Sequence, residues 1–306
     1  MDLKVFNEMS AKVPNLCHLA PAGPTHMHDL NTAGGVRAVQ AELAKKGLLD
    51  LSLMTVTGKT VGENIEGAYI KNTNAIRPID NPYSKTGGIA ILWGNIAKDG
   101  CVVKRSAVAP EMLVHTGPAR VFDSEDTAIK AIYNGEIKGG DVVVIRYEGP
   151  VGGPGMREML NPTSALAGMK LDKTVALSRT EDSAELKGRF DSHVAPEAAA
   201  GGEIGLVEEG DIIDIDIPAA KVNVRVSDEE LAERKKHYVP HELTSKQAGS
   251  QDTRRLFPPP RTRRYEILSK QNKAPPKKIL CAELFYYIIC IIWLKCCNMH
   301  ILKKSQ

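Results

Sequence analysis

Residues 211–226 read DIIDIDIPAAKVNVRV, in which apolar and polar side chains alternate on either side of a Pro-Ala-Ala turn. Strict alternation is typical of β-strands that bury one face. Further short apolar runs, several of them bounded by glycines, recur in the preceding sequence at 89–93, 101–103, 142–145, 174–177 and 204–207. Many short strands with few helices between them favour a β-rich barrel or sandwich over a doubly wound parallel sheet.

Helices are expected at three places in or beside this strand-rich region. Ser124 is a good N-cap for a helix that ends at Gly135. The inward face of that helix is formed by Ala128, Ile129 and Ile132. A second helix is predicted over 156–169, and a third begins at the capping box SDEE (227–230) and continues to Lys236.

Residues 1–75 are expected to be helical and rich in loops. Asn31 or Thr32 can cap a helix that ends at Gly47. The inward face of this helix is formed by Val36, Val39 and Leu43. Residues 48–61 contain enough apolar and β-branched side chains to predict one buried strand.

The formal net charge of +3 averages two unlike pieces of the chain. Residues 1–233 contain 24 Lys and Arg against 33 Asp and Glu, a charge of −9, whereas residues 234–306 contain 16 against 4, a charge of +12. Proline and arginine runs without apolar periodicity predict a disordered basic tail. The tail's apolar run 284–294 is shorter than the roughly 20 residues that span a membrane, so no membrane span is expected.

The cysteines indicate a reducing environment. Of six, only Cys17 and Cys101 precede the tail, and two cysteines do not make a disulfide framework. The first residues, MDLKVFNEMSAKVP, have no apolar core and do not predict a secretory signal. We therefore expect a cytoplasmic protein, or one of an organelle matrix if a transit peptide has been lost.

The stretch 142–160, VVVIRYEGPVGGPGMREML, joins a buried strand to a helix through a loop rich in glycine and proline. Glycines let a backbone approach a ligand closely, and the amides at a helix N-terminus favour anions. Glu158, at the mouth of this loop, is placed to ligate a hard cation such as Mg²⁺. It could equally serve only to complement the helix dipole, and spacing alone leaves both interpretations open.

Seven segments in unbroken order carry a wider resemblance. They are TVTGKT (55–60), IRPIDNPYSKTGGIAILWGN (76–95), GCVVKRSAV (100–108), HTGPARVFDSEDTA (115–128), GDVVVIRYEGPVGGPGMREMLNPTSALAGM (140–169), HVAPEAAAGGEIGLVEEGDIIDIDIP (193–218) and VSDEELAERK (226–235). Over about residues 15–236 the chain resembles the C-terminal part of dihydroxy-acid dehydratases, a family that also contains phosphogluconate and sugar-acid dehydratases. The tail resembles nothing in that family.

The resemblance implies a fold of the α/β class. A β-rich, swivelling, barrel-like domain flanked by helices is expected over 78–236. Residues 1–77 would be the remnant of an N-terminal α/β domain, and residues 237–306 a tail foreign to the family. Members of the family generally form homodimers.

The resemblance also implies a chemistry. Dihydroxy-acid dehydratases are hydro-lyases that convert 2,3-dihydroxy acids into 2-oxo acids in valine and isoleucine biosynthesis. An iron–sulfur cluster acts as Lewis acid on the departing hydroxyl, Mg²⁺ binds at the carboxylate end, and a serine alkoxide takes the C2 proton. The partner implied is thus a small dihydroxy acid, and nucleic acid is not expected.

Two site residues follow from the resemblance. Glu158, in PGMREM (154–159), matches the family's Mg²⁺ ligand. The family's catalytic serine lies in a TDGRFSGG motif, and a glycine–serine loop separates that motif from GHVSPEA. Here GRF (188–190) is displaced toward His193, so Ser192 is the nearest candidate base. Weaker candidates are Ser178 and Ser183.

The cluster ligands of the family lie in its N-terminal domain, and none of the motifs of that domain occurs here. Cys17 and Cys101 do not match those positions, so both are expected to be lone thiols and the cluster ligands to be absent from this chain. Two further polar segments carry no family role: THMHD (25–29), expected to be a helix cap rather than a metal site, and KRS (104–106), which could meet a substrate carboxylate or be a solvated strand end.

The leading hypothesis is a C-terminal fragment of a dihydroxy-acid dehydratase that is inactive alone. One alternative is a sugar-acid dehydratase of the gluconate type, which this part of the sequence does not separate from the first. The other is a non-catalytic scaffold whose basic tail binds nucleic acid or a membrane.

Overall fold

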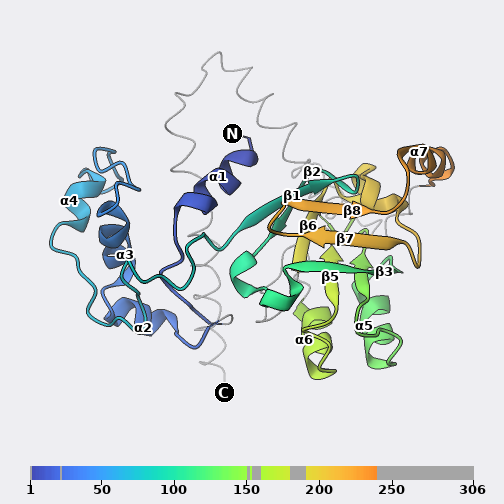
Figure 1. Cartoon of the computed structure of the whole chain (residues 1–306), viewed down its shortest axis with the longest axis horizontal. Coiled ribbons are helices and arrows are strands. Elements are labelled where there is room, and N and C mark those ends of the chain that lie inside the picture. The colour runs from blue at the N-terminus through green and yellow to red at the C-terminus, as the bar shows by residue number, and fades with distance from the viewer. Residues whose placement is uncertain (1, 21–22, 150–151, 154–159, 180–190, 240–306) are drawn as a thin grey trace, which may run out of the picture. The chain divides into compact units, whose positions relative to one another are not determined.

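The computed structural model describes residues 2–20, 23–149, 152–153, 160–179 and 191–239. Eight strands form a closed barrel in the order β1-β2-β6-β5-β4-β3-β7-β8 (Figure 1). Their bounds are β1 Ala90–Gly94, β2 Ala97–Val103, β3 Val114–Phe122, β4 Val142–Ile145, β5 Ala176–Arg179, β6 Asp191–Ala195, β7 Ile212–Asp216 and β8 Lys221–Val224. The predicted β-rich barrel is confirmed.

The barrel combines parallel and antiparallel pairing. β3, β4, β5 and β6 run parallel to one another. β7 and β8 form an antiparallel hairpin that pairs with β3, and β1 and β2 form another that pairs with β6. A parallel pair between Trp93 and Lys221 closes the barrel. The 211–226 segment forms β7 and β8, and β8 makes this closing pair. Because side chains alternate along both strands, Ile213, Ile215, Val222 and Val224 face the interior.

Two helices cover one outer face of the barrel. α5 (Glu125–Tyr133) connects β3 to β4, and α6 (Leu160–Gly168) precedes β5 (Figure 1). The sequence of β4 is apolar throughout because both of its faces are buried. Val142 and Val144 belong to the interior cluster, whereas Val143 and Ile145 pack with the helices. As predicted, Ser124 caps α5 by accepting a hydrogen bond from the Thr127 amide.

The remaining helices lie toward the two ends of the described chain. The N-terminal ones are α1 (Lys4–Lys12), α2 (Met27–Thr32), α3 (Gly35–Ala44) and α4 (Val61–Ile65), and the C-terminal one is α7 (Asp228–His237). Short 3-10 turns are η1 (Arg105–Ala107), η2 (Pro110–Met112), η3 (Ala198–Ala200) and η4 (Glu203–Leu206). α7 begins where predicted, because the Ser227 side chain accepts a hydrogen bond from the Glu230 amide.

Several local predictions are wrong. Asn31 and Thr32 lie inside α2, and α3 begins after Gly34, with Ala38 and Glu42 buried instead of Val36. The predicted strand 48–61 is a series of turns with one isolated bridge, and Val56 in it is 98% exposed. Residues 203–206 form the turn η4 rather than a strand. β3 and β6 were not predicted.

Among the described residues, no helix is long and apolar enough to cross a membrane. The predicted basic tail, with its apolar run 284–294, lies outside the described residues.

Candidate active site

Four parallel strands bring their carboxyl ends to one edge of the barrel. β3 leads there into Asp123, β4 into Arg146–Glu148, and β6 into Pro196 and Glu197. Ligands of sheets with parallel strands bind characteristically at this edge, because loops from several strands converge there. Polar side chains from distant parts of the sequence therefore meet at this place.

Three carboxylates at this edge are almost fully buried. Glu125, Glu148 and Glu197 are 2%, 7% and 9% exposed. A Glu148 Oε1 accepts a hydrogen bond from the Glu125 amide at 2.9 Å, at the start of α5. Burial of a carboxylate is costly unless donors satisfy it, and helix N-termini offer such donors. Glu148 thus ties the end of β4 to the first turn of α5.

Glu197 holds the glycine-rich loop. Its Oε2 accepts a hydrogen bond from the Gly152 amide at 3.2 Å. A Cβ atom at Gly152 would lie 2.4 Å from the Tyr147 carbonyl oxygen, and one at Gly153 would lie 2.6 Å from that of Glu148. Only glycine allows so close a return of the loop onto the residues after β4. The loop is therefore fixed by its own backbone and by a carboxylate from another strand.

Ser192, the predicted base, is a fully buried residue of β6. Its Oγ donates a hydrogen bond to Ser178 Oγ of β5 at 3.3 Å. Val194 and Ala176, two residues away on the same strands, fill the barrel interior, so both hydroxyls face inward. The structure thus brings Ser192 and Ser178 together, and the catalytic role of Ser192 stays a prediction.

Glu158 and Ser183 lie outside the described residues. Among the residues that are described, no group of three or more His, Cys, Asp or Glu side chains is arranged to hold a metal ion. The described carboxylates therefore do not by themselves make a Mg²⁺ site.

The two described cysteines do not fit an iron–sulfur cluster. Cys101 is a fully buried member of the barrel interior, whereas Cys17 packs against the core of the N-terminal helices. Cys17 is a free thiol. Burial raises the pKa of Cys17 to about 11, which disfavours the thiolate that a cluster iron requires.

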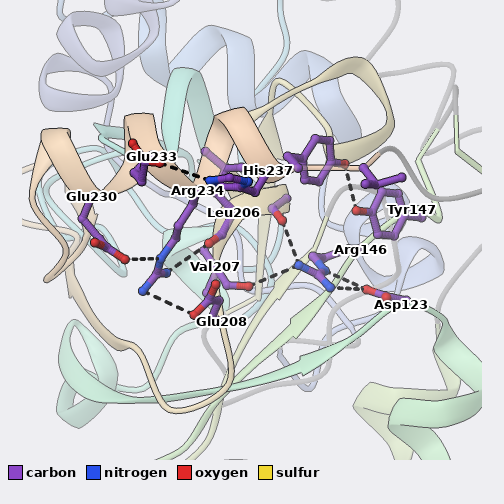
Figure 2. Close-up of a pocket in the computed structure, with 13 residues that line it drawn as sticks. Asp123, Arg146, Tyr147, Leu206, Val207, Glu208, Glu230, Glu233, Arg234 and His237 are labelled. Carbon is purple, nitrogen blue, oxygen red and sulfur yellow. Dashed lines mark hydrogen bonds and ion pairs between the residues drawn. The ribbon is translucent and has the colours of Figure 1, made fainter.

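A cavity of about 500 Å³ adjoins the same edge, between the loops after β3 and β4, η4 and α7. Arg146 and Arg234 are held at its wall by acceptors on several sides (Figure 2). Arg146 pairs with Asp123 at 2.6 Å and donates to the Gly205 carbonyl at 2.9 Å. Both guanidinium groups are thereby engaged in holding the cavity wall.

The predicted cap at 25–29 is confirmed, since the His26 amide donates to Asp29 Oδ2 at 2.8 Å at the start of α2. Residues 104–106 lie at the start of η1, where the Ser106 amide donates to the Gly88 carbonyl. Their proposed contact with a substrate stays untested.

Sequence reasoning did not single out Tyr147 or Glu197. Tyr147 immediately precedes Glu148 and has a φ of 63°, unusual for a residue with a large side chain. A usable signal for Tyr147 was its place after the apolar run 142–145, because polar residues that follow parallel strands converge at one edge. Glu197 follows β6, a strand that the sequence did not predict, so it offered no such signal.

Comparison with known proteins gives the family. Residues 74–257 match the model of the dihydroxy-acid/6-phosphogluconate dehydratase C-terminal domain, and residues 1–64 that of the N-terminal domain. The dihydroxy-acid dehydratase of Acetivibrio thermocellus is 64% identical over 78% of this chain and 43% of its own length, and that of Lachnospira eligens is 64% identical over 79% and 43%.

The dihydroxy-acid dehydratase of Clostridium beijerinckii is similar at 61% identity, over 78% of this chain and 43% of its own length. The chain therefore spans less than half of the curated relatives that it matches. The C-terminal family match covers the whole of a closed barrel that has a glycine loop at its carboxyl edge. The chain belongs to the dihydroxy-acid/6-phosphogluconate dehydratase family.

Proposed function

We propose that this chain supplies the barrel part of a dehydratase that converts a 2,3-dihydroxy acid into a 2-oxo acid, in branched-chain amino-acid biosynthesis. The observation that carries the proposal is the glycine loop, held by Glu197 at the carboxyl edge of the barrel, in a chain 64% identical to proteins named dihydroxy-acid dehydratase.

The described glycines fold the loop onto its own backbone. The Gly152 amide donates to Glu197 and the Gly153 amide donates to the Gly149 carbonyl, and both glycines are buried. Glu148 and Glu197 thus hold the residues on either side of the loop. The loop's proposed role is to line the place where the substrate carboxylate is oriented, which brings the reacting carbons to a defined position.

In the family, Mg²⁺ and an iron–sulfur cluster supply Lewis-acid chemistry at the carboxylate and at the departing hydroxyl. The described residues do not make a site for either group. Glu158 remains our proposed Mg²⁺ ligand and Ser192 our proposed base. Cys17 and Cys101 do not match the cluster ligands of the family, so we expect the 306-residue chain to show no turnover alone.

The domain organisation is part of the same proposal. We assign residues 1–77 to an N-terminal α/β domain and 78–236 to a barrel able to swivel against it. His237 and Tyr238, which the sequence pattern assigned to the tail, belong with α7, and the C-terminal family match continues to residue 257. The supporting observation is that the two family matches meet between residues 64 and 74. A homodimer and a reducing, cytoplasmic location are likewise proposed.

Two chimeras test the proposal. Residues 78–239 replace the aligned C-terminal part of the Acetivibrio thermocellus relative. The native-segment chimera keeps residues 178–192 of this chain, and the restored chimera carries the relative's own residues there. Folding is checked by circular dichroism. Dehydration of 2,3-dihydroxy-3-methylbutanoate is then measured after anaerobic cluster reconstitution, with the intact relative as positive control.

We expect the restored chimera to be active. The native-segment chimera keeps Ser192 and tests it as the base: turnover would support Ser192, and an inactive but folded protein would refute that assignment. A folded restored chimera without turnover would refute the proposed function. Activity of the restored chimera alone would leave the function standing and assign the defect to residues 178–192.

The sugar-acid alternative is favoured by one observation, since the matching family model also covers 6-phosphogluconate dehydratases. Assay of the restored chimera with a sugar acid separates the two. A preference for the sugar acid over the branched-chain acid, absent from the parent enzyme, would assign that substrate class to the barrel.

A further inference from the structure

Two tyrosines connect the C-terminal helix to the glycine loop. Tyr147 follows β4 and is 7% exposed, inside the hydrophobic cluster of the barrel. Tyr238 is the residue that caps the C-terminal end of α7 and packs against the same cluster. Their hydroxyl oxygens are 2.8 Å apart, and Figure 2 shows the contact to Tyr147 at one side of the cavity.

The hydrogen bonds of this pair have a defined direction. Tyr238 donates its single hydroxyl hydrogen to the Ala198 carbonyl at 3.0 Å. A phenol has one hydrogen, so Tyr147 is the donor in the contact between the two hydroxyls. Burial, and then the hydrogen bond to Tyr238, raise the pKa of Tyr147, so this donor keeps its proton at neutral pH.

Both ends of this chain of hydrogen bonds lead to the glycine loop. Ala198 directly follows Glu197, whose carboxylate accepts the Gly152 amide. Tyr147 directly precedes Glu148, and its own carbonyl is the atom that a side chain at Gly152 would strike. Tyr238 thus contacts both segments between which the loop is held.

The backbone of Tyr147 gives a reason for such a support. Its φ of 63° lies in the left-handed region, which is unfavourable for a residue with a large side chain. An unfavourable conformation persists only where the surroundings hold it, and such places are concentrated at functional sites. The Tyr238 hydroxyl and the Arg146 guanidinium, 5.4 Å from the ring centre, are two parts of those surroundings.

We propose that Tyr238 is a positioning residue, which acts through Tyr147 to hold Gly152 and Gly153 of the glycine loop in place, beside the position proposed for the substrate carboxylate. The loop's part in binding rests on the proposed function. The mechanical link from α7 to the loop does not.

Hydrogen exchange of the full 306-residue chain tests the link without any activity. We expect Tyr238→Phe and Tyr147→Phe each to speed exchange in peptides that cover residues 146–153 by about tenfold. The double variant should add little to Tyr238→Phe, because that change already removes the hydrogen bond to Tyr147 together with the one to Ala198. Tyr133→Phe is the matched control, since this tyrosine lies on α5 and is 63% exposed.

Unchanged exchange at 146–153 in both single variants would overturn the proposal, as would additive effects or faster exchange spread equally over all barrel strands. If Tyr238→Phe failed to fold, Tyr147→Phe would supply the measurement from the other end of the connection.

The restored chimera adds a second readout. Tyr238→Phe should raise its KM for the dihydroxy acid several-fold, whereas a mere loss of folded protein would lower the maximal rate and leave KM unchanged. An unaltered KM with faster exchange would refute the role in substrate binding. An inactive parent chimera would instead refute the proposed function and leave the exchange result as the test of the link.

Discussion

Replacement of Arg234 by methionine should destabilise the barrel far more than the same change at Arg225. Arg234, on α7, pairs with Asp211 at 2.6 and 3.2 Å just before β7, and their side chains are 15% and 12% exposed. Arg225 makes an equally close pair with Asp214, at 2.7 and 2.8 Å, but those side chains are 59% and 38% exposed. The two pairs differ in burial and in their further partners, because Arg234 also donates to the Leu206 carbonyl and pairs with Glu230.

The magnitude follows from that difference. Removal of one partner of a buried pair leaves a charge without its counterion and costs about 3–5 kcal/mol, whereas an exposed pair contributes about 0–1 kcal/mol. Asp211 keeps the Glu208 amide at 2.8 Å as a donor and retains some solvent contact. We therefore expect a loss of about 2–3 kcal/mol for Arg234→Met, and below about 1 kcal/mol for Arg225→Met.

Urea unfolding of the full chain measures both variants. The midpoint should fall with an unchanged slope, and the melting temperature of Arg234→Met should drop by about 8 °C. Methionine retains the aliphatic part of the side chain, so packing is largely preserved. Equal losses in the two variants would refute the argument from burial.

Three further predictions concern other parts of the chain. Gly94→Ala should lower the free energy of unfolding in urea by about 3 kcal/mol or more, because its Cβ would lie 1.6 Å from the Val222 carbonyl where β1 meets β8. The control is Gly168→Ala, whose Cβ would meet no atom within 4 Å outside its own helix and should cause no loss. Similar losses in the two variants would contradict this reasoning. The hydrogen bond from Arg225 lowers the pKa of Asp214 below its usual 3.8, so the stabilisation by this pair is present above about pH 4 and fades as the pH falls through the folded pKa. NMR titration should show a higher Asp214 pKa in Arg225→Met, and an unchanged value would count against the pairing. Cys17, with its pKa of about 11, should react with iodoacetamide at pH 8 about 100-fold more slowly than in the urea-unfolded chain, as measured by peptide mass spectrometry; equal rates would contradict its burial.

Local pattern was sufficient for some elements and not for others. The alternation in 211–226 predicted β7 and β8 because each strand has one face in the interior and one in solvent. β3 contains Gly117 and Pro118 and no regular alternation, and it becomes a strand through pairing with β4 and β7. The prediction for residues 48–61 was wrong in the opposite sense. Their apolar composition predicted a strand, but the segment pairs with no strand of the barrel and forms turns.

The site shows the same division. The glycine loop was visible in the sequence, since glycine has a direct backbone meaning. The contact of Glu197 with Gly152 joins residues 45 positions apart, and the contact of Tyr147 with Tyr238 joins residues 91 apart. Such pairs depend on the register of the barrel, which no local pattern contains. The resemblance gave the family, and the tertiary contacts gave the support of the loop.

The most direct test of the central claim is the dehydration rate of the restored chimera. If this barrel is the C-terminal part of a dehydratase active site, 2,3-dihydroxy-3-methylbutanoate should be converted into its 2-oxo acid at a rate within about tenfold of the intact relative, about 1.4 kcal/mol in activation free energy. A correctly folded, cluster-loaded chimera with no conversion above the uncatalysed background would contradict the claim.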